Sequence, residues 1–594
     1  MRKFAVVSVF AIVFAVAADP FDFSSYTQSV SLEFASKKEA QAAELVPRGL
    51  PANYDLAFSS RWDDGPMSHL NTFKIMKKYG AKGNFYINRD LNGDISVLRH
   101  IVSDGCLVGA HTVHHYPMRR LAANVHFYEY MANRIAAEVR TQTPVNTQTS
   151  PYGNITGDLP EGTQSIGRAL MAAGIIGSPD SSSPEHLKLL GYPENSCAFM
   201  YRIVPGDRVP DLQKLETTLA NYLKMKELKK DPAISMSTHS WHTKKGLPLL
   251  DECYKRLTSH KNWWNCNQNE YAAYRYEALN TTVTKKVTGK SVTFTIQRFE
   301  PFELGANVPL YFDIKGAKAL ASSSGSLEND GTQLKMEHGK TNTLPSKYGY
   351  KKLDGVELSL SLRENDGTLT ATVSGENSAK VTDITFTFRK APKYDKLVER
   401  VSVRQIKNGT VIAVDPGKIS RNSYHYTVGK PYFAVQMDYF LDGRRCRLYA
   451  DHFGKAAQLK EKAINEMVVL YERPENWNDG AKLSDPANAD QPIALKKLPP
   501  VPETPECTPG SIYKGKNTPR TGYIGIADII CNEEKEHKVR IHSDKNGAMY
   551  FNGTLLPKRK TMTLKFRRGK NRLLLLDKRD ASHVFNILEN SCSK

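Results

Sequence analysis

The stretch LAFSSRWDDGPMSHLNTFKIMKKYGAKGNFYIN, residues 56–88, contains the pattern that decides the fold. Residues 56–60 form a short apolar run that predicts a buried strand, and residues 84–88 predict a second one. Between them, apolar residues recur at helical spacing up to Gly80: Met67, Leu70, Phe73, Met76 and Tyr79. Strand, helix and strand in this order predict a βα unit of a parallel sheet.

The same alternation continues to about Tyr276, so we expect one parallel α/β domain over residues 50–276. Further strands are predicted at 107–110, 145–149, 197–204 and 233–238. A second helix is indicated by the spacing of Val125, Tyr128, Ala132, Ile135 and Val139.

Chemically active residues follow the predicted strands directly: Asp63 and Asp64, His111 and His115, Tyr152, and His239. In a (β/α) barrel these positions converge at the C-terminal mouth, so one site can use all of them. Carboxylate and imidazole groups bind divalent metals, and a spare carboxylate can act as a base. The pattern therefore predicts metal-assisted hydrolysis.

Each histidine taken alone is better explained as an ordinary core or surface residue. Two histidines at positions i and i+4, downstream of Asp-Asp-Gly, favour a metal site instead; His114 competes with His115 for the second place. A zinc protease also uses two histidines four apart, but it needs Glu directly after the first, where this chain has Thr112. The protease interpretation is thereby excluded.

These motifs resemble the polysaccharide deacetylases of the NodB-homology type, a carbohydrate esterase family. The usual Thr-Phe-Asp-Asp-Gly corresponds to residues 61–65, and the His-Ser/Thr-x-x-His motif corresponds to residues 111–115. The resemblance implies an incomplete (β/α) barrel, with Asp63 as general base. It also implies that Asp64, His111 and His115 bind the metal, since only His115 fits the family spacing.

The third family motif, Arg-x-Pro-Tyr/Phe-Gly, corresponds to residues 149–153 and keeps Pro151, Tyr152 and Gly153. The resemblance implies that the Tyr152 N–H stabilises the oxyanion. The motif's Arg, which orients and tunes the base in the family, is Thr149 here. The last motif places His239 as the general acid.

Some assignments in this region remain open. Asp180 and Asp207 are the candidates for the Asp that orients His239. Pro151 and Trp241 are candidate substrate contacts, the latter because it follows His239 closely. Two imidazoles and one carboxylate suit zinc, with cobalt or another divalent ion as alternatives.

The first eighteen residues predict a signal peptide: Arg2 and Lys3 precede an apolar run, and Ala15-Val16-Ala17 forms a cleavage site. We therefore expect a secreted, periplasmic or cell-surface protein with no transmembrane segment, since the run is too short to span a bilayer. The eight cysteines are expected to be buried or disulfide-bonded rather than catalytic, and Cys253 and Cys266 could close a short loop.

After Tyr276 the sequence becomes β-rich, so we expect a multidomain chain with β-sandwich-like domains after the barrel. We predict a β-sandwich module at 277–395 and a further β-rich region at 396–475, which either extends that module or forms its own unit and ends in a helix at 455–471. A Pro-rich linker is predicted at 476–510. Strands in 511–594 resemble galactose-binding-like jelly-roll modules.

The chain has a formal net charge of +20. We expect an acetylated polysaccharide as partner. The positive charge is better explained as a solvated basic surface than as a specific site, and an acidic polysaccharide is the alternative that suits it. An exported chain without a recognition motif indicates no nucleic acid. The leading prediction is metal-dependent removal of N- or O-linked acetyl groups. The alternative is a noncatalytic exported glycan-binding protein on the same barrel, which the replacement of Arg by Thr149 favours. The sequence leaves the sugar and the oligomeric state open.

Overall fold

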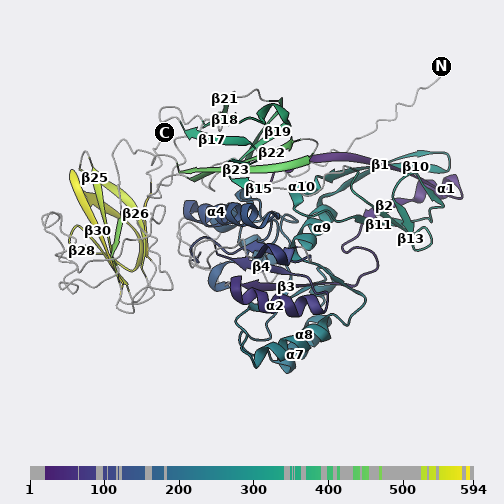
Figure 1. Cartoon of the computed structure of the whole chain (residues 1–594), viewed down its shortest axis with the longest axis horizontal. Coiled ribbons are helices and arrows are strands. Elements are labelled where there is room, and N and C mark those ends of the chain that lie inside the picture. The colour runs from purple at the N-terminus through teal and green to yellow at the C-terminus, as the bar shows by residue number, and fades with distance from the viewer. Residues whose placement is uncertain are drawn as a thin grey trace, which may run out of the picture.

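Figure 1 shows the computed structural model of the chain. It describes residues 21–64, 66–88, 98–102, 105–115, 118, 123–153, 164–178, 184–339, 348–350, 352–353, 355–362, 369–389, 398–405, 411–414, 432–441, 444–453, 467–470, 523–531, 534–543, 547–577 and 583–588. The predicted signal peptide and Pro-rich linker lie outside these residues.

The N-terminal α/β domain is built on a parallel sheet in the order β5-β4-β3-β7-β6, with β8 also paired to β3. Its strands are β3 (Leu56–Asp63), β4 (Asn84–Ile87), β5 (Leu107–Ala110), β6 (Tyr201–Ile203), β7 (Ala233–His239) and β8 (Trp263–Asn265). All eight residues of β3 are buried, which is expected for a central strand covered on both faces. The predicted parallel sheet is thus confirmed.

Isolated parallel bridges connect the two ends of this sheet. Ala110 at the end of β5 bridges to Gln148, Thr147 bridges to Gly177, and Gly177 bridges to Ala198, which lies just before β6. These bridges lead from β5 back toward β6, so the sheet closes in the manner of a barrel. Along this side of the barrel, single bridges take the place of full strands. The strand predicted at 145–149 is therefore wrong as a strand; Pro144, which lacks an N–H, precedes it and only two residues pair.

Helices cover the sheet as the sequence predicts. The helix α2 starts at Pro66, a favoured residue for the first helical position, and ends before Gly80, which has a φ of 61°. The helices of the domain are α2 (Pro66–Lys78), α3 (Arg99–Val102), α4 (Ala123–Thr141), α5 (Gln164–Ala172), α6 (Pro184–Leu189), α7 (Leu212–Lys224), α8 (Gly246–Leu257) and α9 (Gln268–Asn280).

Several antiparallel sheets follow the barrel, and the first two recruit strands from before it. Strand β1 (Ser25–Glu33) pairs with β10 (Ser291–Phe299), and β2 (Glu44–Pro47) pairs with β11 (Leu310–Lys315). The remaining strands of these two sheets are β9 (Thr282–Thr288), β12 (Ala321–Ser322), β13 (Ser326–Glu328) and β14 (Gln333–Met336). The short helix α1 (Lys37–Ala42) lies between β1 and β2 along the chain, and α10 (Pro301–Leu304) lies between β10 and β11.

The next sheet has nine strands in the order β20-β19-β22-β23-β15-β16-β17-β18-β21. Its strands are β15 (Tyr348–Tyr350), β16 (Lys352–Leu353), β17 (Val356–Leu362), β18 (Leu369–Ser374), β19 (Val381–Arg389), β20 (Val398–Gln405), β21 (Val411–Val414), β22 (Tyr432–Leu441) and β23 (Arg444–Phe453). One sheet thus contains strands from both sides of residue 395. The domain boundaries at 277, 395 and 475 stay predictions.

The C-terminal strands form a five-stranded and a three-stranded antiparallel sheet. They are β24 (Met467–Leu470), β25 (Tyr523–Cys531), β26 (Lys535–Ser543), β27 (Gly547–Phe551), β28 (Thr554–Leu555), β29 (Arg559–Phe566), β30 (Gly569–Asp577) and β31 (His583–Leu588). The resemblance of residues 511–594 to a galactose-binding-like module stays a prediction. The helix predicted at 455–471 is wrong at its end, because Met467–Leu470, which contains two β-branched valines, pairs with β25. Residues 455–466 lie outside the described residues.

Two further expectations concern cysteines and membranes. Five described cysteines are free thiols, four of them buried: Cys106, Cys197, Cys253, Cys266 and Cys446. No loop is therefore closed between Cys253 and Cys266. Within the described ranges, no helix is long and apolar enough to cross a bilayer.

Candidate metal centre

The predicted site residues lie at the carboxyl ends of the barrel strands. Asp63 ends β3 and is followed by Asp64, His111 directly follows β5, and His239 ends β7. The backbone here adopts left-handed conformations at non-glycine positions: φ is 74° at Asp64, 62° at His115 and 65° at Tyr152. Such conformations are costly outside glycine and cluster at functional sites.

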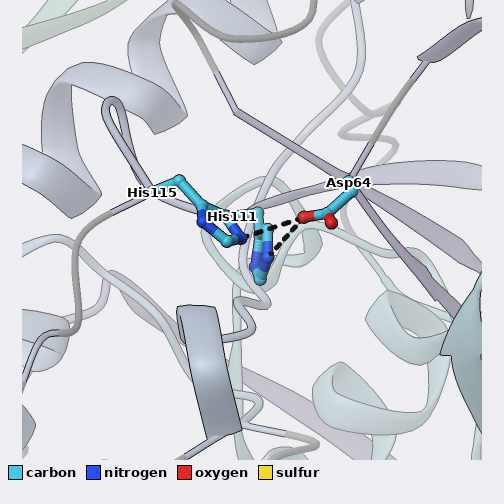
Figure 2. A group of neighbouring side chains, drawn as sticks. All are labelled: Asp64, His111 and His115. Atoms are coloured by element: carbon cyan, nitrogen blue, oxygen red, sulfur yellow. Dashed lines mark ion pairs between the residues drawn. The ribbon is translucent and has the colours of Figure 1, made fainter. Parts of the chain in front are cut away.

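Three of these residues form a group that could hold a divalent metal (Figure 2). Oδ1 of Asp64 lies 3.2 Å from Nε2 of His111 and 3.0 Å from Nε2 of His115. Their ligand atoms all lie within 4.8 Å of one another. One carboxylate and two imidazoles are a common donor set for a catalytic divalent ion, with room for water and substrate.

The other ring nitrogen of His111 is held by the backbone. Nδ1 of His111 donates to the Thr149 carbonyl at 2.9 Å and lies 2.7 Å from Thr149 Oγ1. With the proton on Nδ1, the lone pair of Nε2 faces Asp64. Metal-binding histidines are oriented in this way in proteins.

His114, the competing candidate, has a different place. Its Nδ1 lies 2.6 Å from Oε1 of Glu129, while Oε2 of Glu129 accepts from the backbone N–H groups of Val113 and His114. Asn133, one helical turn further along α4, accepts from the His111 N–H at 3.1 Å. Residues of α4 therefore fix the loop that carries His111 and His115.

The charges of the group attract a cation. Burial alone would raise the pKa of Asp64, but the neighbouring imidazoles of His111 and His115 hold it far below its usual range. Burial alone would lower the pKa of His111, yet the carboxylates of Asp63 and Asp64 raise it. The negative potential that favours a proton on the imidazole equally favours a metal ion.

Asp63 makes a different set of contacts, although it is next to Asp64. Arg61 donates from Nε to Oδ1 at 3.0 Å and from Nη2 to Oδ2 at 2.5 Å. Thr149 donates from Oγ1 to Oδ1 at 3.1 Å. Burial would raise the pKa of Asp63, but Arg61 and, less strongly, His111 lower it to about 2, so the carboxyl group is ionised at neutral pH.

His239 lies on the other side of Asp64, with Nε2 at 3.8 Å from Oδ2. Its Nδ1 is 3.0 Å from Oδ1 of Asp207, which also accepts from the His239 N–H at 3.2 Å. The ring of Trp241 stacks on the imidazole with centroids 4.1 Å apart, and the indole is 40% exposed. Of the two candidates for the orienting Asp, Asp207 is in place; Asp180 is outside the described residues.

Tyr152 and Pro151 lie at the same mouth. The ring of Tyr152 contacts that of His115 edge-on at 5.0 Å and is 70% exposed, whereas Pro151 is buried. Tyr152 and Trp241 are thus exposed aromatic surfaces beside His115 and His239. The structure brings the predicted residues together; their roles stay predictions.

Sequence reasoning missed three contributors, and each left a signal in the sequence. Arg61 lies two residues before Asp63 on a strand, where side chains share a face, so its contact with Asp63 was readable from the spacing. Glu129 and Asn133 are four residues apart on α4, which places them on one helix face. Their target, the backbone of the histidine loop, could not be read from sequence.

Residues 57–170 match the family model described as polysaccharide deacetylase. This chain contains a polysaccharide deacetylase domain in its N-terminal region. The matched residues include Asp63, Asp64, both predicted metal histidines and Tyr152. No curated protein matches the chain.

Three solved structures are similar to part of this chain. Peptidoglycan deacetylase PdaC from Bacillus subtilis is 12% identical, covering 37% of this chain and 91% of that one, with a TM-score of 0.24. A family 4 carbohydrate esterase from Streptomyces lividans is 12% identical, covering 36% and 92%, with a TM-score of 0.25. A family 4 acetyl xylan esterase from Clostridium thermocellum is 12% identical, covering 36% and 89%, with a TM-score of 0.25.

Proposed function

We propose that the deacetylase domain hydrolyses N- or O-linked acetyl groups of a polysaccharide with the help of a divalent metal. The observation that carries this proposal is the pairing of two neighbouring carboxylates with different partners. Asp64 faces His111 and His115, while Asp63 stays ionised beside Arg61. The first arrangement suits a metal and the second suits a base.

The roles of the residues follow from their contacts. Asp64, His111 and His115 would hold the metal, which supplies Lewis acidity toward water and the acetyl carbonyl. Asp63 accepts the proton of the attacking water, and the N–H of Tyr152 donates to the oxygen on which negative charge develops. His239, oriented by Asp207, gives a proton to the departing amine or hydroxyl.

Zinc is the proposed ion, with cobalt or another divalent ion as alternatives. Zinc accepts nitrogen and oxygen ligands and needs no redox change for hydrolysis. Nitrogen donors from His111 and His115 favour it over magnesium or calcium, which prefer oxygen ligands.

The polysaccharide is proposed from the chemistry around the site and from the charge of the chain. Trp241 and Tyr152 offer exposed rings on which a sugar can stack, with Pro151 in the loop between Thr149 and Tyr152. A net charge of +20 favours an acidic glycan. A secreted, periplasmic or cell-surface location fits such a substrate.

The experiment is acetate release by zinc-loaded protein from chitin oligomers, acetylated xylan and acetylated acidic heteropolysaccharides, with D63N as control. Release by the wild type that is lost in D63N supports the deacetylase. Equal release by both proteins contradicts the role of Asp63. Zinc binding with no release from any glycan would favour the noncatalytic glycan-binding alternative.

A further inference from the structure

Arg61 lies in the middle of the barrel, on the strand that delivers the base. Its side chain is 2% exposed, and the carboxyl group of Asp63 is also buried. A buried guanidinium is costly unless a carboxylate and further acceptors satisfy it. The two contacts of 3.0 Å and 2.5 Å to different oxygens of Asp63 form the fork geometry typical of Arg and carboxylate.

A fork of this kind fixes the carboxylate plane. Two parallel hydrogen bonds oppose rotation of the carboxylate about its last torsion, which is otherwise broad. The hydroxyl of Thr149 meets the same Oδ1 at 3.1 Å. Arg61 and Thr149 therefore hold one carboxylate from two different segments of the barrel.

Thr149 also connects this carboxylate to the metal group. Its Oγ1 lies 2.7 Å from Nδ1 of His111, and its carbonyl accepts from the same nitrogen at 2.9 Å. Asp63, Thr149 and His111 thus form a chain of contacts in which a displacement of Asp63 would reach the imidazole.

We infer that Arg61 is the positioning residue of the base, supplying from β3 the guanidinium that residue 149 does not carry. This inference rests on the proposed function. Arg61 and Thr149 donate to the same oxygen of Asp63. Exchanging the two residues should therefore place the guanidinium at position 149 instead of position 61, and the Asp63 carboxylate should keep a cationic partner. R61T combined with T149R is therefore the sharpest variant.

The test measures kcat, KM, zinc content and crystal structures for wild type, R61M, R61K, R61T and R61T/T149R. R61M keeps most of the volume and loses the charge, and R61K keeps the charge and loses the fork. The control is R48M, which removes the ion pair of 2.5 Å between Arg48, the residue after β2, and Asp313 on β11.

We expect R61M to lower kcat by roughly 100-fold with KM nearly unchanged and zinc retained, since small misplacements of reacting groups cost about this much. R61K should stay low, R61T/T149R should recover activity over R61T, and R48M should match the wild type. In R61M crystals the contact between Asp63 Oδ1 and Thr149 Oγ1 should be lost.

Several outcomes would overturn the inference. An active wild type with unchanged kcat in folded R61M would do so, as would a double variant no better than R61T. If R61M does not fold, R61K and the double variant decide. If the wild type releases no acetate, the proposed function fails separately, and the R61M crystal structure still decides: an unmoved Asp63 carboxylate contradicts the positioning role.

Discussion

Helix α4 supports two regions that both bury charge, and the two regions use it differently. Toward the metal centre, Glu129 and Asn133 bind backbone groups of the histidine loop. Toward the nine-stranded sheet, Glu138 accepts from Arg134 at 3.0 Å and from the Tyr449 hydroxyl. Helix α4 thus connects the deacetylase domain to the nine-stranded β sheet.

In the sheet-facing region each buried carboxylate has a guanidinium partner. Arg447 donates to Asp438 at 2.6 Å, and Gln436 donates to the other Asp438 oxygen at 2.7 Å. Arg389, on β19, reaches across to the Ala172 carbonyl at 3.1 Å. Buried carboxylates here are matched by guanidinium groups, which is the arrangement expected of a structural contact.

In the metal centre, Asp64 has no guanidinium partner of this kind among the contacts described. Asp64 meets two imidazoles rather than a permanent cation, whereas its neighbour Asp63 has Arg61. The comparison teaches that buried charge alone does not mark a site. A candidate site is marked by a carboxylate that faces metal-binding groups and lies beside a second carboxylate with a permanent cation as partner.

The largest effect on activity is expected from substitution of Asp63, the carboxylate with a permanent cation as partner. D63N keeps the side-chain volume but cannot accept the water proton, so kcat should fall by about 10²- to 10⁴-fold. Zinc content should stay at the wild-type level because Asp64, His111 and His115 are intact. Acetate release and elemental analysis measure the two quantities; a D63N protein with wild-type turnover would contradict the assignment.

Substitution of a carboxylate in the sheet-facing region should lower stability instead of activity. E138A leaves Arg134 without its buried carboxylate, which should lower the free energy of unfolding by about 3–5 kcal/mol. E216A, which removes the exposed pair with Arg256, should cost no more than about 1 kcal/mol. Urea denaturation of both variants provides the check, and equal losses would refute the structural reading.

Acid should weaken a second structural pair. Burial would raise the pKa of Glu303, but Arg400 holds it well below the usual value of 4.5. A depressed pKa contributes stability above pH 4.5 that is lost progressively as the pH falls. The unfolding free energy should therefore decline below pH 4.5, and E303Q should flatten that decline; an unchanged slope in E303Q would count against the pair.

The smallest effect is expected at the mouth. W241A removes an exposed ring that stacks on His239, and loss of an aromatic contact is typically worth about 0.5–1.5 kcal/mol. KM for the best glycan should rise by roughly 2- to 13-fold. A matching W241F should restore most of the affinity, whereas a KM unaffected by W241A would remove Trp241 from the substrate contacts.

Much of the barrel could be predicted because β3, α2 and β4 carry strong local patterns. The carboxyl ends of these strands then bring Asp64, His111 and His115 together, as their spacing indicated. The pairing of β1 with β10 could not be predicted, since its partners lie more than 250 residues apart. The contact of Arg61 with Asp63 is consistent with their spacing on one face of β3, but the spacing alone does not show that the guanidinium turns toward this carboxylate.

The central claim is that Asp64, His111 and His115 hold one divalent metal, whereas Asp63 is no metal ligand and acts as base. Calorimetric titration of zinc into metal-stripped wild type, D63N and H115A tests it most directly. The account predicts one tightly bound zinc per chain in wild type and D63N, and loss of that site in H115A. Full zinc binding by H115A would contradict the account.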